Sequence, residues 1–252
     1  MGKIIPVKEI DDLVPIKHVF ATTTDKAGLT TNQRSDGSTI PGLPENGLVG
    51  VLFGVSPNAI VISTGGTAEH IEKAGYKVIE IGDYTGWPEM ETGLVKSMNP
   101  KLYVGMLAHP YTPSDAKYLT HHGIPEIDMV IVNFYPFQEA VSKNPKSADA
   151  AAIEIIRQQM DVGGPTAVHT SRKGFLTTAV ATRPEDYAMF AEDLVRYNGQ
   201  ISIDSRLAAM KNASEDLADY FSAIRDFTRD LTPQDIRAAY PTIHNKTSEF
   251  GK

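Results

Sequence analysis

A short turn in the first third of the chain combines residue types that can hold a phosphate group. A β-branched run at residues 59–63 leads into it and a helical pattern follows at residues 68–74, so its backbone N–H groups meet at a predicted helix N-terminus. Aligned peptide dipoles and unpaired donors favour an anion there. Glycines let the backbone approach a ligand closely, and hydroxyls can donate hydrogen bonds to phosphate oxygens. The turn residues are Ser63, Thr64, Gly65, Gly66 and Thr67.

Three further segments carry polar residues where predicted strands or helices end. One is a loop with a lysine, one follows the most apolar strand, and one surrounds a second glycine-opened helix start. Ligands of open α/β sheets bind outside the carboxyl ends of the strands, so we expect these segments to converge on the turn at residues 63–67. Their candidate residues are Lys96, Ser97, Asn133, Tyr135, Asp161, Gly163, Gly164 and Lys173.

Each candidate also has a simpler explanation when it is taken alone. The glycine turn fits an ordinary strand-to-helix connection, and the lysines fit solvated loop positions. Tyr135 fits a half-buried aromatic residue with its hydroxyl in water. Asp161 fits a helix N-cap, and Asn133 fits a side chain that bonds a neighbouring turn. Only their joint occurrence with the turn favours a binding site.

Strands alternate with helices along the chain, which predicts an α/β fold with a mainly parallel sheet. The strand at residues 128–133 is uniformly apolar, as expected where helices cover both faces. Other strands are predicted at residues 17–22, 59–63, 77–81, 101–108 and 176–181. Helices are predicted at residues 48–55, 68–74, 114–122, 148–159, 166–172, 184–197 and 205–227.

The remaining segments lack periodicity, and no linker marks a domain boundary. Residues 31–47 are rich in glycine and polar residues and predict an exposed loop. We therefore expect one domain over residues 1–252, with a core at about 17–229 and an irregular tail at 230–252.

Composition excludes several classes of protein. The 252 residues are 41% hydrophobic and 22% charged, as in a globular protein, and the net charge of −7 argues against nucleic-acid or membrane surfaces. The absence of cysteine excludes disulfides and thiolate metal sites and suits a cytoplasmic location. No apolar run approaches a membrane span. The loose group of His109, His121 and His122 lacks a metal-binding pattern, so no metal is expected.

Five motifs, in order, resemble the IMP cyclohydrolase domain of the bifunctional purine-biosynthesis enzyme. The similarity covers about residues 19–228 and implies a methylglyoxal-synthase-like fold, a three-layer sandwich with a mainly parallel sheet. Nothing in the chain resembles that enzyme's AICAR transformylase domain. The motifs are Ser63-Thr-Gly-Gly-Thr67, Asp83-Tyr-Thr-Gly-Trp-Pro-Glu-Met90, Val95-Lys96 with Pro100-Lys101, Val132-Asn-Phe-Tyr-Pro-Phe137, and Asp161-Val-Gly-Gly-Pro-Thr166 with Lys173.

The resemblance implies an enzyme that closes the purine ring of formyl-AICAR to give IMP and water, without a cofactor. It further implies a homodimer, and leaves the transformylase step to a separate protein. By the resemblance, Lys96, Tyr135, Asp161 and Lys173 are catalytic. Likewise, the substrate contacts are Thr24, Lys26, Ser63, Thr64, Gly65, Gly66, Thr67, Ser97, Asn133, Gly163 and Gly164.

The chain also departs from this family's pattern. Leu94 replaces a substrate-binding arginine, Asn99 replaces a histidine, and Gly174 replaces an asparagine. Losing a guanidinium removes a bidentate anion contact that lysine does not replace. Two rival functions therefore stay open: a methylglyoxal-synthase-type phosphosugar enzyme and a non-catalytic purine-nucleotide-binding module.

Overall fold

The computed structural model describes residues 6–88, 90–91, 93–144 and 150–240. The chain divides into two compact units, which are described separately. The first comprises Met1–Phe134 and Val162–Leu217, and the second comprises Tyr135–Asp161 and Ala218–Lys252. The single domain expected over residues 1–252 stays a prediction.

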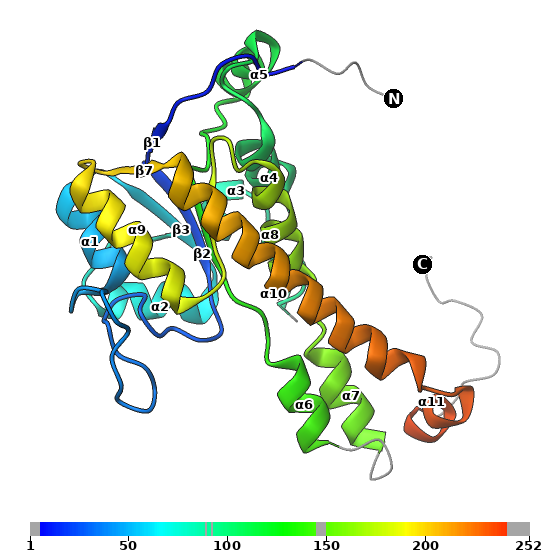
Figure 1. Ribbon diagram of the computed structural model, residues 1–252. Helices are drawn as coiled ribbons and strands as arrows, with labels where there is room; N and C mark the ends of the chain where they lie inside the picture. Colours follow the sequence, from blue (N-terminus) through cyan, green and yellow to red (C-terminus); the bar gives the residue numbers. More distant parts are fainter. Residues whose placement is uncertain (1–5, 89, 92, 145–149, 241–252) are drawn as a thin grey trace. The chain divides into compact units, whose positions relative to one another are not determined.

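A five-stranded parallel sheet in the order β4-β3-β2-β5-β6 lies at the centre of the first unit (Figure 1). Each neighbouring pair of strands is parallel, so all their carboxyl ends lie along one edge of the sheet. A second, two-stranded sheet joins β1 antiparallel to β7. The strands are β1 Leu13–Pro15, β2 His18–Thr22, β3 Ile60–Ser63, β4 Ile79–Glu80, β5 Met129–Val132, β6 Ala179–Ala181 and β7 Gln200–Ser202.

The helices of the first unit connect these strands. They are α1 Gly47–Val55, α2 Gly65–Lys73, α3 Ile81–Thr85, α4 Pro100–Leu107, α5 Pro113–His122, α8 Gly163–Lys173 and α9 Pro184–Arg196. The second unit contains α6 Phe137–Lys143, α7 Ala150–Gln158 and α11 Pro233–Ala239. Helix α10, Ile203–Arg229, belongs to the first unit up to Leu217 and to the second from Ala218.

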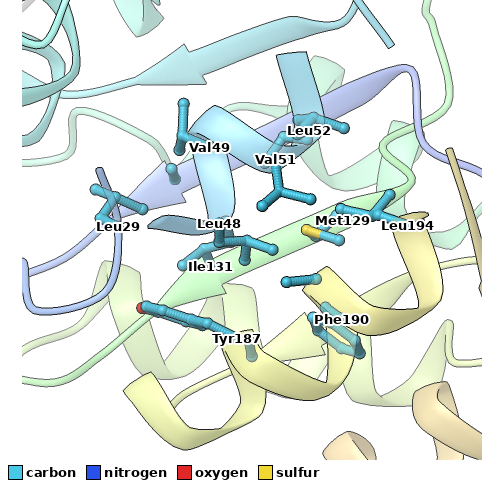
Figure 2. Packing of buried hydrophobic residues seen from close by; sticks show 14 of the residues in the cluster. Leu29, Leu48, Val49, Val51, Leu52, Met129, Ile131, Tyr187, Phe190 and Leu194 are labelled. Atoms are coloured by element: carbon cyan, nitrogen blue, oxygen red, sulfur yellow. The ribbon is translucent and has the colours of Figure 1, made fainter. Parts of the chain in front are cut away.

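Side chains alternate along the strands between two hydrophobic cores, one on each face of the sheet. In β2, Val19 and Ala21 belong to one core, and Phe20 between them belongs to the other. Helices α1 and α9 cover the first face, where they pack with Met129 and Ile131 of β5 (Figure 2). Helices α4 and α8 supply Leu102, Met106, Ala167 and Val168 to the second core. This arrangement confirms the expected three-layer α/β sandwich.

The strand predicted at residues 101–108 is wrong, because this segment forms helix α4. Asn99 caps the helix by accepting a hydrogen bond from the Lys101 N–H at 2.9 Å, and Pro100 occupies the first turn, where a missing N–H costs nothing. The buried residues are Leu102, Gly105 and Met106, which follow helical rather than alternating spacing.

The irregular tail predicted from residue 230 is also wrong in part, because α11 forms within it. Thr232 accepts a hydrogen bond from the Asp235 N–H at 3.2 Å, and the Asp235 side chain accepts one from the Thr232 N–H at 2.8 Å. This reciprocal capping box satisfies two N–H groups that a helix N-terminus otherwise leaves unpaired. The remainder of the tail, residues 241–252, lies outside the described part of the chain.

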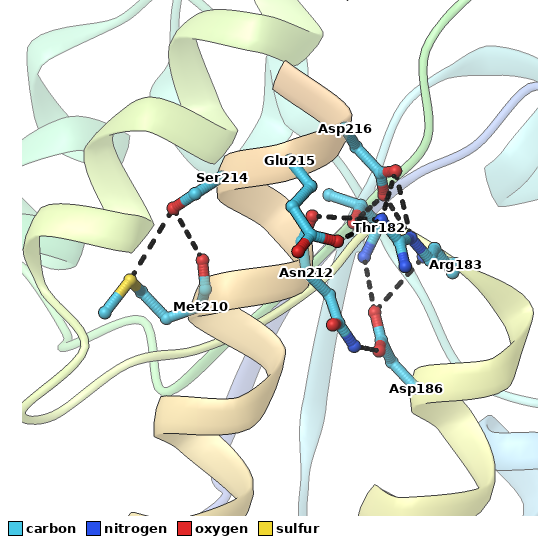
Figure 3. Close-up of polar contacts among 8 residues, drawn as sticks. All are labelled: Thr182, Arg183, Asp186, Met210, Asn212, Ser214, Glu215 and Asp216. Atoms are coloured by element: carbon cyan, nitrogen blue, oxygen red, sulfur yellow. Dashed lines mark hydrogen bonds and ion pairs between the residues drawn. The ribbon is translucent and has the colours of Figure 1, made fainter. Parts of the chain in front are cut away.

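A polar network fastens α10 to the turn between β6 and α9 (Figure 3). The buried Asp186 carboxylate accepts hydrogen bonds from Asn212 Nδ2 at 2.7 Å and from the N–H groups of Thr182 and Arg183. Arg183 Nε donates to both Asp216 carboxylate oxygens at 2.9 Å. The network therefore holds the first half of α10 beside the carboxyl end of β6.

Asp128 directly precedes β5, at the amino end of the strand, and its buried carboxyl group makes the stability of the protein depend on pH. Burial raises the pKa of Asp128 from 3.8 to about 7, although its carboxylate accepts the N–H groups of Lys17 and His18. The folded protein thus binds this proton more tightly than the unfolded chain does. The contribution of Asp128 to the free energy of unfolding should therefore fall, by roughly 2 to 4 kcal/mol, as the pH rises from about 4 to about 7.

Asp128→Asn stays neutral and should lack this decline. In urea unfolding at several pH values, the free energy of unfolding of Asp128→Asn minus that of the wild type should increase as the pH rises. Asp219→Asn, which changes an exposed carboxylate on α10, serves as the control. Parallel pH curves for wild type and Asp128→Asn would contradict the prediction.

Candidate functional site

The turn between β3 and α2 presents an open helix N-terminus. Thr64 precedes the helix, but its side chain makes no capping hydrogen bond and instead pairs with Thr22 Oγ1 at 3.0 Å. Gly65 has a positive φ of 44°, and a Cβ on Gly66 would meet nothing within 4 Å. The first turn contains no acidic residue. The turn can therefore present its N–H groups to an anion without competition from a local carboxylate.

Two hydroxyls of this turn are engaged with the protein's own backbone. Ser63 Oγ is fully buried and donates to the Ala21 carbonyl at 2.7 Å. Thr67 Oγ1 accepts the Thr23 N–H at 3.0 Å and donates to the Thr23 carbonyl at 2.9 Å. These bonds attach the turn to the end of β2. The anion-binding capacity of the turn therefore rests on its N–H groups and on Thr64.

Lys96 lies beside this helix N-terminus. Its Nζ is 3.6 Å from the point where a Cβ on Gly65 would stand, and its side chain is half-buried. The preceding residue, Val95, has a φ of 57°, which is strained for a β-branched side chain. A lysine at the positive end of a helix concentrates positive charge there, and this favours a bound anion.

Ser97 contacts the N-terminus of a second helix, α8. Its buried Oγ lies 3.1 Å from the position of a Cβ on Gly163, the first residue of α8, whose first turn also lacks acidic residues. The helix begins three residues before the predicted start at residue 166, because Pro165 falls in the first turn, where its missing N–H is tolerated. Adjacent residues of one loop thus contact two glycine-opened helix N-termini.

Asn133 fixes the loop that follows β2. Thr22 of β2 pairs in register with Val132 of β5, so the loops after both strands start side by side. Asn133 Oδ1 accepts the N–H groups of Thr24 at 2.6 Å and Asp25 at 3.1 Å, and Nδ2 donates to the Asp25 carbonyl at 2.7 Å. The side chain of Asn133 therefore shapes the segment that carries the predicted contacts Thr24 and Lys26.

Lys26 adds to the positive charge near α2. Its Nζ donates to the carbonyls of Thr23 and Thr24 at 3.3 Å. Burial lowers the pKa of His70 on α2, and the charges of Lys26 and Lys73 act in the same direction. Lys26 therefore lies close enough to α2 for its charge to affect the ionisation of His70.

The second unit holds two more of the catalytic candidates, Tyr135 and Asp161. Tyr135 is exposed. The backbone N–H of Asp161 donates a hydrogen bond to Tyr220 Oη at 2.6 Å. Burial raises the pKa of Tyr220 to about 12, with smaller effects of Asp161 and Tyr135 in the same unit. Tyr220 was missed by sequence analysis, because a tyrosine within an amphipathic helix carries no signal of a partner so far away in the chain.

Lys173 is exposed at the C-terminal end of α8. Ten residues separate it from Gly163, which corresponds to about 15 Å along a helix axis. The contacts of the described residues therefore bring together Lys96, Ser97 and Gly163, and do not include Lys173. Its catalytic role stays a prediction.

The three departures from the family pattern have different structural settings. Asn99 caps α4, and Leu94 is 61% exposed. Gly174 has no room for a side chain, because its Cβ would stand 2.4 Å from the Met106 carbonyl oxygen. A glycine at position 174 is thus required by the close packing of α8 and α4 in this chain.

Gly174→Ala is accordingly expected to lower the free energy of unfolding by about 1 to 3 kcal/mol, since the backbone must shift to admit a methyl group. Gly54→Ala is the matched control, because a Cβ on this α1 glycine would meet nothing within 4 Å. Thermal or urea unfolding of both variants measures the difference. Equal stabilities for the two variants would contradict the close approach at Gly174.

Among residues 6–88, 90–91, 93–144 and 150–240, no three His, Asp or Glu side chains gather as a metal ion would require. None of the helices in the same ranges is both long enough and apolar enough to cross a bilayer.

Comparisons with known proteins agree on the fold. Residues 58–166 match the MGS-like domain family, a match that includes the β3–α2 turn, Lys96 and the start of α8. The crystal structure of ForH superimposes with a TM-score of 0.66 at 25% identity, covering 84% of this chain and 98% of that one.

Sequence relatives are bifunctional purine biosynthesis proteins named PurH. The protein from Neisseria meningitidis is 36% identical over 192 residues, covering 76% of this chain and 35% of that protein. Those from Gloeothece citriformis and Acaryochloris marina are 37% and 38% identical, covering 72% and 67% of this chain and 34% and 33% of those proteins. The matched region spans about a third of the length of these relatives.

Proposed function

Because this chain contains an MGS-like domain at residues 58–166 and is related in sequence to PurH, we propose that it is an IMP cyclohydrolase. The observation that carries the proposal is the convergence of two helix N-termini on Lys96 and Ser97. A nucleotide needs an anion site for its phosphate and a second polar site for its base. Two glycine-opened helix starts that meet at one loop fit this requirement.

In the proposed complex, the N-terminus of α2 binds the 5′-phosphate. The N–H groups of Gly65 and Gly66 and the Thr64 hydroxyl donate hydrogen bonds to phosphate oxygens, and the charge of Lys96 adds to the helix dipole. Thr24 and Lys26 belong to the loop held by Asn133 and complete the predicted contacts with the phosphate and ribose.

Ring closure requires a proton acceptor and a stabilised oxyanion. The carboxamide nitrogen attacks the formyl carbon and loses one proton, and the formyl oxygen becomes a hydroxyl group. This oxygen then leaves as water with a proton from the formamide nitrogen. We assign proton acceptance to Asp161, and stabilisation of the oxygen to the first turn of α8 around Gly163 and Gly164. Tyr135 would orient the carboxamide or Asp161.

The remaining expectations are part of the same proposal. Lys173 keeps its proposed catalytic role on the basis of the family resemblance alone. A homodimer follows from the same resemblance, and a cytoplasmic location from the composition of the chain. The name of the relatives, bifunctional purine biosynthesis protein, is consistent with a purine nucleotide as substrate.

A direct assay tests the function. The purified chain is incubated with formyl-AICAR, and IMP is followed by absorbance and chromatography. We expect saturable conversion to IMP without an added cofactor. Binding of IMP without turnover would instead favour the nucleotide-binding module, and methylglyoxal released from dihydroxyacetone phosphate would favour the phosphosugar enzyme.

A further inference from the structure

Tyr220 closes the turn that ends at Asp161. Its Oη accepts the Asp161 N–H at 2.6 Å and donates to the Gln159 carbonyl at 2.8 Å. All three residues belong to the second unit, and Tyr220 is only 7% exposed. A single phenol hydroxyl thus holds both ends of a three-residue turn, of which the last residue is a catalytic candidate.

An aromatic cluster fixes the position of this hydroxyl. The Tyr220 ring meets Phe137 edge-on at 6.2 Å between centroids, and Phe137 meets Phe227 in the same way at 5.8 Å. A tyrosine has only two side-chain torsions, so packing of the ring leaves its hydroxyl little freedom. Phe137 follows Tyr135 by two residues, so the cluster also anchors the segment that carries Tyr135.

The hydroxyl has the protonation state that both hydrogen bonds require. Burial raises the pKa of Tyr220 to about 12, so the phenol keeps its proton at neutral pH. A neutral phenol can donate one hydrogen bond and accept another at the same time.

We propose that Tyr220 is a positioning residue for ring closure. Its hydroxyl holds the backbone at Asp161 in a fixed position relative to the segment that carries Tyr135. This inference rests on the proposed function. Tyr220 acts through Asp161 and does not itself touch the substrate. Its loss should therefore affect kcat, while leaving KM, which reports binding at the α2 turn, largely unchanged.

The test is a double-mutant cycle. Tyr220→Phe keeps the ring and removes only the hydroxyl, and we expect kcat to fall about 10-fold with KM within twofold of the wild type. The same change made in Asp161→Asn should lower the residual kcat less than twofold, because the residue that Tyr220 positions has already lost its function.

Tyr111→Phe is the matched control. Tyr111 Oη also accepts a backbone N–H, that of Asp11 at 3.1 Å, and donates to a carboxylate oxygen of the same residue at 3.1 Å. It lies in the first unit, outside the proposed site. This variant should therefore keep the kcat of the wild type.

Hydrogen exchange gives a readout that does not depend on activity. The Asp161 amide should exchange about 10-fold faster in Tyr220→Phe and at the wild-type rate in Tyr111→Phe. The inference is overturned if Asp161 exchange does not change, or if Tyr220→Phe lowers kcat equally in both backgrounds. If the wild type shows no turnover, the proposed function fails and the inference fails with it; normal wild-type turnover with an unaffected Tyr220→Phe refutes the inference alone.

Discussion

Asp161→Asn is expected to lower kcat for conversion of formyl-AICAR to IMP by a factor of about 10² to 10⁴, with a much smaller change in KM. An amide has nearly the shape of the carboxylate, but it cannot accept the proton that the attacking nitrogen must lose. The Asp161 N–H to Tyr220 bond belongs to the backbone, so the substitution leaves it in place. Steady-state kinetics of the purified variant measure the effect.

Asp219→Asn provides the control, because it removes an exposed carboxylate from the part of α10 that belongs to the same unit. Its kcat should match that of the wild type. If Asp161→Asn kept more than a tenth of the wild-type kcat, Asp161 would not be the proton acceptor.

Lys96→Met is expected to lower kcat/KM by a factor of about 10² to 10³, since it removes a cation that stabilises negative charge on the bound nucleotide. Methionine keeps most of the apolar stem, so packing around the half-buried side chain should change little. The positive charge beside Gly65 is the specific feature that is lost. Kinetics and calorimetric titration with IMP should show weaker binding as well as slower turnover.

Lys73→Met is the matched control, because it removes the same charge from the opposite end of α2. Lys73 forms an exposed pair with Glu69, and such pairs contribute little to stability. Equal losses of IMP affinity in the two lysine variants would indicate a general effect of net charge rather than a site at the N-terminus of α2.

The sequence predicts the sheet and the glycine turn between β3 and α2 well, because both depend on local patterns. The uniformly apolar β5 indicated a strand covered on both faces, and the glycine turn between β3 and α2 lies where the pattern placed it. The β3-α2-β4 unit is parallel, as the alternation of strand and helix predicts.

Short apolar segments were harder to assign. The run at residues 101–107 fits a strand or a buried helix, and only the Asn99 and Pro100 start signals distinguish them. The capping box of Thr232 and Asp235 is a comparable start signal for α11, and the prediction of an irregular tail overlooked it. Strand β1 has three residues, and its pairing with β7 far along the chain leaves no local signal.

The hydrogen-bond partners and contacts of the side chains within the site could not be predicted from sequence. Ser63 and Thr67 have the residue type of phosphate donors, but their hydroxyls bond the backbone at the end of β2. The meeting of Ser97 with Gly163 joins segments 66 positions apart. Such tertiary contacts depend on how the helices pack on the sheet rather than on local composition.

A crystal structure of the chain with bound IMP tests the central claim most directly. We predict the 5′-phosphate at the N-terminus of α2, within hydrogen-bond distance of the Gly65 and Gly66 N–H groups and of Lys96, with the purine ring against Ser97 and the start of α8. IMP bound with its phosphate away from Gly65 and Lys96 would contradict the account.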